Sequence, residues 1–236
     1  MNKSIGITIG DIKGIGIELL IKLWKEKKIK NFFLITNKNL FKSYLDEKKI
    51  KLPIKYYKNN EKIDNKYFYV HNINAKKNDE NTINSLKESY SLYQKRICYS
   101  VINLPLNKEK VIKKNKFFIG QTEYYQNLEK KKLSNMIFYS KKIIMLTLTT
   151  HIPLKMVNKY LRKNEIIYKK IEYFHKTLEK DFNIKNPKII IAGINPHAGE
   201  NGNLGNDEIE YLIPILERLR KKNINIEGPF SADTMF

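Results

Sequence analysis

The sequence predicts an α/β protein built on a mainly parallel sheet that is covered by helices on both faces. Short apolar segments rich in Ile, Leu and Val alternate with segments whose apolar residues recur at helical spacing. Hydrophobic residues make up 42% of the 236-residue chain and aromatic residues 11%, which is enough to form a buried core. The composition therefore argues against a disordered chain.

The first half of the chain reads as strand, helix, strand and helix, followed by a polar stretch. Segment 4–11 predicts a buried strand that ends in a glycine-rich turn. The helix after this turn carries apolar residues at helical spacing, namely Ile15, Leu19, Leu20 and Trp24. The further elements predicted here are a strand at 31–37, a helix at 38–48, a strand at 67–72 within the otherwise irregular segment 51–80, and a helix at 81–98 capped by Asn81.

The second half contains three more apolar strands with helices between them. The strands are predicted at 101–106, 141–150 and 187–194, and the helices at 165–181 and 207–221. The apolar face of the first helix is Ile167, Ile171, Phe174 and Leu178, and that of the second is Ile209, Leu212, Ile213, Leu216 and Leu219. Segment 224–236 begins another strand and turn. Because no Gly/Ser-rich or Pro-rich linker interrupts the chain, residues 1–236 are expected to form a single α/β unit whose internal boundary the composition does not mark.

Basic residues outnumber acidic ones by 45 to 24, so the formal net charge is +21 at pH 7. Of the basic residues, 41 are Lys and only 4 are Arg. Lys, Asn and Ile have A/T-rich codons, so a base bias of the genome explains the lysine excess without a nucleic-acid partner. Arg is the usual bidentate reader of phosphate and guanine, and its scarcity argues against sequence-specific nucleic-acid binding. Nonspecific, salt-sensitive binding of polyanions stays open.

The chain shows no sign of a membrane or secreted protein. No apolar run approaches the roughly 20 residues of a membrane-spanning helix, and the N-terminal residues lack the features of a signal peptide. The single cysteine, Cys98, cannot form an internal disulfide or a thiolate-rich zinc site, which fits a reducing compartment. We expect a cytoplasmic protein with no membrane partner.

Two of the four histidines follow apolar strands. His151 ends the predicted strand 141–150, and His197 follows the strand 187–194. Because the carboxyl ends of parallel strands meet at one edge of a sheet, both imidazoles are expected to face a ligand crevice. Imidazole is a good ligand for zinc and cobalt, so His151 and His197 are candidate ligands of a divalent metal. A hydrogen-bonding role within each loop is the alternative.

Two strand-to-helix turns are candidates for anion binding. The turn GDIKGIG at 10–16 matches neither the dinucleotide-binding pattern nor the Walker pattern, and a plain structural turn explains it as well. Gln121 and Thr122 open another helix, where a hydroxyl and backbone N–H groups can hold an anion. Helix capping alone also accounts for Thr122.

Taken together, five segments resemble the 4-hydroxythreonine-4-phosphate dehydrogenase family of pyridoxal phosphate biosynthesis. The order and spacing of these segments agree with the family along the whole chain, and NPHAGE followed by a helix and GPFSADT is the most specific part. The five segments are ITIGDIKGIGIE at 7–18, GQTEYY at 120–125, LTTHIPL at 148–154, INPHAGENGNLGNDEIEYLIPIL at 194–216 and GPFSADTMF at 228–236.

The resemblance implies an isocitrate-dehydrogenase-like three-layer α/β/α fold and a homodimer. It implies oxidation of 4-phosphooxy-L-threonine with NAD or NADP to a β-keto acid, which loses carbon dioxide to give 3-amino-2-oxopropyl phosphate on the way to pyridoxine 5′-phosphate. It also implies a divalent metal (Zn, Mg or Co) on His151 and His197, substrate contacts from Gln121 and Thr122, and a catalytic position for Asp233. The cofactor-binding residues are not assigned.

The chain departs from the family at four places. Ile12 and Ile17 replace two prolines of the usual GDPAGIGPE, and Asn203 stands where family members often have His. Gln121 stands where the family usually has His, and Gln can donate a hydrogen bond but cannot carry a proton as imidazole does. The sequence also stops after ADTMF, where the family continues, so it is expected to lack the C-terminal portion of the fold. The alternative to an active dehydrogenase is therefore a truncated, non-catalytic remnant that keeps affinity for phosphate or polyanions.

Overall fold

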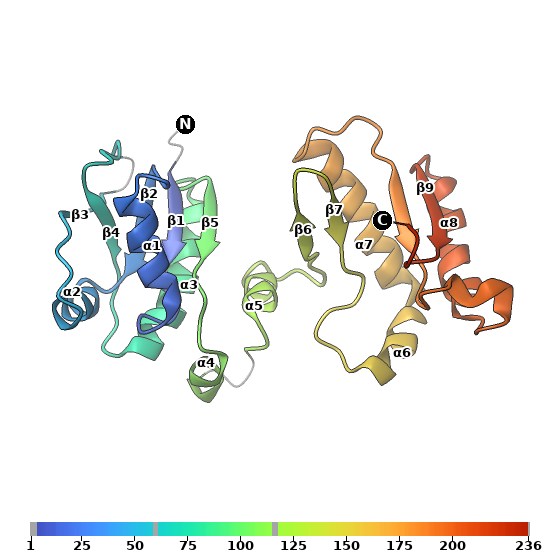
Figure 1. The fold of residues 1–236 in the computed structure, drawn as a ribbon, viewed down its shortest axis with the longest axis horizontal. Coiled ribbons are helices and arrows are strands. Elements are labelled where there is room, and N and C mark those ends of the chain that lie inside the picture. Colours follow the sequence, from blue (N-terminus) through green and yellow to red (C-terminus); the bar gives the residue numbers. More distant parts are fainter. Residues whose placement is uncertain (1–3, 59–60, 115–117, 236) are drawn as a thin grey trace. The chain divides into compact units, whose positions relative to one another are not determined.

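The computed structural model describes residues 4–58, 61–114 and 118–235 and divides the chain into two compact units (Figure 1). Unit 1 is Met1–Glu129 and unit 2 is Lys130–Phe236. The division falls just after helix α5 (Gln121–Leu128), at a point that the composition does not mark. In the described part of the chain, no helix is long and apolar enough to cross a membrane.

Unit 1 is built on a five-stranded sheet with the order β3-β4-β2-β1-β5, and every neighbouring pair is parallel. The strands are β1 (Ile5–Thr8), β2 (Phe32–Thr36), β3 (Ile54–Tyr56), β4 (Phe68–Asn72) and β5 (Ser100–Asn103). The helices are α1 (Ile15–Lys25), α2 (Lys38–Glu47), α3 (Asn78–Gln94), α4 (Lys108–Lys114) and α5. The predicted α/β fold with a mainly parallel sheet is confirmed.

Strand β2 is buried at all five positions and serves both faces of the sheet. Phe32 and Leu34 point into a cluster with residues of α1 and α2. Phe33 and Ile35 point into a second cluster, which includes Leu92 of α3. Since side chains alternate along a strand, an unbroken apolar run such as FFLIT is explained only by burial on both sides. Helices therefore cover both faces, as the sequence predicts.

The apolar face predicted for the first helix is wrong in part. Ile15 and Leu19 are 74% and 52% exposed. The helix instead buries Ile17, Leu20 and Ile21, together with Gly16. Gly16 has no side chain, so it does not contribute to the apolar pattern of the sequence although it lies on the buried face of the helix. A Cβ on Gly16 would lie 2.8 Å from Pro105 Cδ, so the close approach of helix and strand end explains the glycine.

Helix α3 begins before the position that the sequence indicates. It starts at Asn78 rather than at 81, and Asn81 is a fully buried residue of the first turn instead of the cap. The Asn81 side chain accepts a hydrogen bond from the Asn37 backbone N–H at 2.8 Å and donates one to the Thr36 hydroxyl at 2.9 Å. Asn81 therefore ties α3 to the end of β2. Strand β3, in the segment predicted to be irregular, escaped detection because it is a short and largely exposed edge strand.

Unit 2 contains two small sheets and a helical layer. Its strands are β6 (Ile137–Tyr139), β7 (Ile144–Leu146), β8 (Ile189–Ala192) and β9 (Ile226–Phe230). Its helical segments are η1 (Leu154–Met156), α6 (Val157–Leu161), α7 (Asn164–Lys180), η2 (Ala198–Gly202), the π-helical turn η3 (Glu208–Leu212) and α8 (Ile213–Arg220). The predicted core face of α7 is confirmed, because Ile167, Ile171, Phe174 and Leu178 are all buried. In the next helix, Leu212, Leu216 and Leu219 are buried, whereas Ile209 is 46% exposed.

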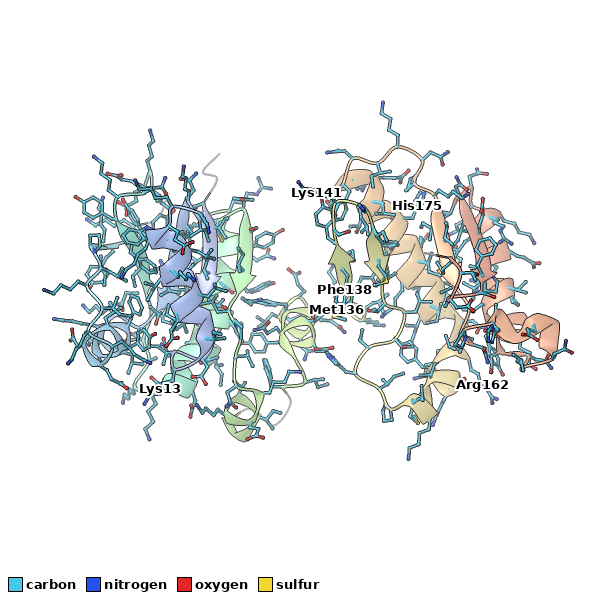
Figure 2. The ribbon with its side chains drawn as sticks, viewed as in Figure 1. Lys13, Met136, Phe138, Lys141, Arg162 and His175 are labelled. Atoms are coloured by element: carbon cyan, nitrogen blue, oxygen red, sulfur yellow. The ribbon has the colours of Figure 1, made fainter. Side chains whose placement is uncertain are left out.

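Strand 141–150 is shorter than predicted and runs in a different kind of sheet. Only Ile144–Leu146 is extended, and it pairs antiparallel with β6. Phe138 on β6 and Met145 on β7 are about half exposed, so the hairpin has an open apolar face (Figure 2 labels Phe138). Strands β8 and β9, in contrast, are parallel to each other. The prediction that His151 leaves a parallel strand is therefore wrong, since β7 is an antiparallel strand that ends at Leu146.

Replacing Asn81 by Leu tests its role in the fold of unit 1. The change leaves the Asn37 N–H without its acceptor and the Thr36 hydroxyl without its donor, so we expect a loss of about 1–3 kcal/mol in the free energy of unfolding. Urea unfolding followed by the fluorescence of Trp24 measures it. Asn39, which is exposed on α2, provides the control: Asn39→Ala should change stability by less than about 0.5 kcal/mol. Equal stability of N81L and the parent would contradict the assignment.

Candidate functional site

In unit 1, the glycine-rich turn after β1 packs against the end of β5. Gly10 has φ +61, and a Cβ at this position would lie 2.3 Å from the Pro105 carbonyl oxygen. The Asp11 N–H donates to that same oxygen at 2.9 Å, and the hydroxyl of Thr82 on α3 donates to the Gly10 carbonyl at 2.6 Å. Because β1 and β5 are parallel neighbours, their carboxyl ends form one edge of the sheet, where α/β proteins bind ligands.

Helix α5 brings Gln121 and Thr122 to this edge. The Gln121 side-chain amide donates to the carbonyl of Leu104, just past β5, at 3.3 Å. The hydroxyl of Tyr125, one turn further along, donates to Asn103 Oδ1 at 2.8 Å and lies 2.8 Å from the Ser89 hydroxyl. Burial raises the pKa of Tyr125 to about 12, so the phenol keeps its proton at neutral pH and remains a donor.

The start of α5 has no side-chain cap. Gly120 is the N-cap residue and has no side chain with which to cap the helix. Capping therefore does not explain Thr122, which is half-buried inside the first turn. The Thr122 hydroxyl lies at the positive end of this helix, where it can donate to an anionic group.

In unit 2, the structure brings His197 and Asp233 together. His197 stands just before η2 and Asp233 follows β9, and the two segments are joined by a hydrogen bond from the Ala232 N–H to the Pro196 carbonyl at 2.8 Å. His197 Nδ1 lies 3.5 Å from Asp233 Oδ2. The two side chains are 55% and 45% exposed, so a dissolved substrate can reach them.

Buried Glu208 fixes the loop that carries His197. Glu208 is only 3% exposed, and its Oε1 accepts the backbone N–H groups of Ile194 at 2.8 Å and Asn195 at 2.9 Å. Its other carboxylate oxygen lies against Gly199, where a Cβ would come within 2.9 Å. Gly199 also has φ +73, a conformation that favours glycine. A single carboxylate therefore sets the path of the NPHAGE segment.

His151 lies in the segment between β7 and η1, in a left-handed conformation with φ 54. Lys170 on α7 is buried and holds this segment by hydrogen bonds. Its ammonium group donates to the Leu148 carbonyl at 3.0 Å and to the Thr147 carbonyl at 3.5 Å. The side chain of Asn135 in turn donates to the Lys170 carbonyl. Thus a buried lysine positions the chain three residues before His151.

Among the described residues, no three or more His, Cys, Asp or Glu side chains lie close enough together to hold a metal ion. The contact of His197 with Asp233 joins two such side chains. Glu208, Tyr125 and Lys170 were not recognised as site residues from the sequence. Only Lys170 had a signal, because it follows Ile167 by three residues and so falls on the apolar face of its helix.

The comparisons with known proteins point to one family. The family model for the pyridoxal phosphate biosynthetic protein PdxA matches residues 28–236. The 4-hydroxythreonine-4-phosphate dehydrogenase of Aquifex aeolicus is 35% identical over all of this chain and 76% of its own length, and that of Sulfurihydrogenibium is 28% identical over 99% and 76%. A crystal structure of the enzyme from Klebsiella pneumoniae superposes on all of this chain and 76% of that one with a TM-score of 0.86 at 23% identity.

The fold and the matches together define the class of protein, an α/β enzyme. The chain belongs to the family of the pyridoxal phosphate biosynthetic protein PdxA. It covers about three quarters of the length of the relatives that it matches.

Removing the Glu208 carboxylate should loosen the loop of His197. Glu208→Ala leaves two half-buried N–H groups without their acceptor, and hydrogen bonds to a charged group contribute about 1.5–3 kcal/mol each. We expect faster hydrogen exchange at residues 194–199 and a lower melting temperature. Glu208→Gln, which keeps an oxygen acceptor, should lose less. Unchanged exchange in Glu208→Ala would show that the loop is held by other contacts.

The hydroxyl of Tyr125 should stabilise the packing of α5. Tyr125→Phe removes the hydrogen bonds to Asn103 and Ser89, and we expect a loss of about 1–2 kcal/mol in the free energy of unfolding. Tyr93 is half exposed on α3 and serves as the matched control, since Tyr93→Phe should leave stability unchanged within about 0.5 kcal/mol. Urea unfolding followed by Trp24 fluorescence distinguishes the two variants. Equal effects in both would contradict the role given to Tyr125.

Proposed function

We propose that this chain is a metal-dependent NAD(P) dehydrogenase that oxidises 4-phosphooxy-L-threonine. The product is a β-keto acid, which loses carbon dioxide to give 3-amino-2-oxopropyl phosphate in pyridoxine 5′-phosphate biosynthesis. Membership of the family supports the reaction, and the pairing of His197 with Asp233 on two strand-end loops is the structural observation that carries it. We further propose that the enzyme acts as a homodimer in the cytoplasm.

The residues of unit 2 suit a divalent metal by their chemistry. A metal-binding histidine usually donates its second ring N–H to a carboxylate, and Asp233 faces Nδ1 of His197, which leaves Nε2 for the ion. We propose His197 and His151 as ligands, with the remaining positions open to substrate and water. A bound Zn²⁺, Mg²⁺ or Co²⁺ would polarise the substrate oxygen and stabilise the negative charge that develops there.

The protein side chains are proposed to orient the metal ligand and the substrate. Asp233 Oδ2 lies 3.5 Å from His197 Nδ1, a position from which it can orient the imidazole. Gln121 and Thr122 are proposed to contact the substrate through the side-chain amide and the hydroxyl. Gln121 cannot itself act as an acid or base, so its contribution is limited to binding. The cofactor-binding residues for NAD or NADP are not assigned.

Variants of the His197 and Asp233 pair test the proposal. The full chain is assayed with 4-phosphooxy-L-threonine, NAD or NADP, and Zn²⁺, Co²⁺ or Mg²⁺. Because Asp233 orients a metal-binding imidazole, Asp233→Asn should lower metal affinity or turnover by about 10- to 100-fold. His197→Ala should lower both further and His151→Ala should lower metal affinity, with metal binding followed by calorimetry.

A histidine outside the site provides the control. His175, labelled on α7 in Figure 2, has Glu179 as its neighbour at 3.4 Å, and His175→Gln should keep both turnover and metal affinity. Turnover that survives in His197→Ala would overturn the proposed site. Metal binding without any turnover in the parent chain would favour the alternative, a non-catalytic remnant.

A further inference from the structure

Unit 1 contains a cavity of about 660 Å³ at the amino ends of its parallel strands. One wall is the segment between the end of α1 and the start of β2, and the other is segment 62–66 before β4. Both walls precede parallel strands, so the cavity lies at the amino ends of β2 and β4, whereas Gly10 and Gln121 lie at the carboxyl ends of β1 and β5. Its volume falls within the range of about 300–1,000 Å³ typical of small-molecule sites.

Four lysines line this cavity, together with a single carboxylate, that of Asp64. The lysines are Lys27, Lys30, Lys62 and Lys66. Within the part of the chain that the structure describes, none of the four forms an ion pair, although neighbouring Lys28 pairs with Glu26 at 2.7 Å. Like charges gathered around a hollow repel one another and raise the local positive potential, which a bound anion relieves.

The walls of the cavity are held in place without a ligand. The Asn65 side chain accepts the Asn31 backbone N–H at 2.9 Å, which joins the two walls directly. The Asp64 N–H donates to the hydroxyl of Tyr69, a buried residue of β4, at 3.2 Å. Since the backbone of both walls is fixed to the sheet, little ordering is needed when a ligand binds.

Two further side chains narrow the class of ligand. Trp24 packs edge-on against Phe68, with ring centroids 5.7 Å apart, and also lines the cavity, where it offers an aromatic surface. Asp64 Oδ1 accepts the Lys66 N–H at 3.0 Å, and among the described residues Oδ2 has no hydrogen-bond donor. This oxygen would repel a bare phosphate but can accept from a hydroxyl or an amino group. The lining therefore suits an anion that also carries a ring and donor groups.

We propose that this cavity binds a nucleoside triphosphate, with the lysines on the phosphates, the base against Trp24 and a ribose hydroxyl on Asp64. The residues that line this cavity include none of the proposed dehydrogenase residues, and the proposal does not depend on the reaction proposed above. Lysine is well suited to phosphate as a compact point charge. The binding is therefore expected to weaken as salt screens the charges.

The only tryptophan of the chain, Trp24, reports on the cavity directly. The full chain is titrated with ATP and, separately, with inorganic triphosphate, and the fluorescence of Trp24 is followed, with calorimetry as a second measurement. We expect a saturable change with ATP and weaker binding of triphosphate. The double variant Lys30→Gln/Lys62→Gln removes two charges, and at about 1 kcal/mol each the affinity should fall roughly 30-fold.

A matched control removes two lysines elsewhere. Lys141 and Lys142 are exposed at the turn between β6 and β7 (Figure 2 labels Lys141), and Lys141→Gln/Lys142→Gln should bind ATP as the parent does. Equal weakening in both double variants would assign the binding to the net charge of the chain and overturn the site. The absence of saturable ATP binding in the parent would do the same. A single-stranded oligonucleotide that binds equally well to all variants would report general polycation binding only.

The variant Asp64→Asn tests whether Asp64 makes the cavity prefer ATP over inorganic triphosphate. The amide keeps an oxygen for the Lys66 N–H but removes the negative charge, so inorganic triphosphate should bind more tightly and the preference for ATP should shrink. If the parent binds triphosphate as tightly as ATP, the ribose and base contacts are wrong. The substituted side chains are exposed, so each variant should fold as the parent does. Circular dichroism of each variant checks this.

Discussion

The burial of β2 on both faces is the constraint on which unit 1 depends. Its five residues FFLIT divide between two apolar clusters, so a layer of helices is required on each side. Parallel pairing with β1 and β4 follows from the helical crossovers, and it gives the sheet two chemically different edges. The glycine turn and α5 gather at the carboxyl edge, and the lysine-lined cavity lies at the amino edge.

Unit 2 depends on buried polar contacts to a greater degree than on strand pairing. Its sheets have only two strands each, too few to fix long loops by themselves. Glu208 binds two N–H groups ahead of His197, and Lys170 binds the carbonyls ahead of His151. Burying a charged group without partners is costly, so these residues hold their loops in one arrangement. The exposed imidazole of His197 is thus positioned by a carboxylate that a substrate never reaches.

The sequence predicted the elements whose apolar pattern is strong and missed those that depend on tertiary contacts. Unbroken apolar runs gave β1, β2, β4 and β8, and helical spacing gave the core of α7. The edge strand β3 is largely exposed and therefore has no such pattern. The apolar run of β7 predicts a strand but not its antiparallel partner, because an apolar run does not specify the direction of pairing. Asn81 resembles a cap in sequence, yet its hydrogen bonds go to a distant strand. The motif resemblance points to His197 and Asp233, which the fold brings together, but not to Glu208, whose hydrogen bonds form only in the folded loop.

Net charge and local charge give different information about this protein. The lysine excess follows from composition alone and predicts only diffuse attraction to polyanions. In the folded protein several lysines form ion pairs with carboxylates, which offset their charge locally. Lys110 pairs with Asp11, and Lys222 pairs with Glu172. The four lysines of the cavity have no such partner among the described residues and surround a hollow with an aromatic wall. A compositional bias can supply the charges, whereas the arrangement of Trp24, Asp64 and the lysines around one cavity comes from the fold.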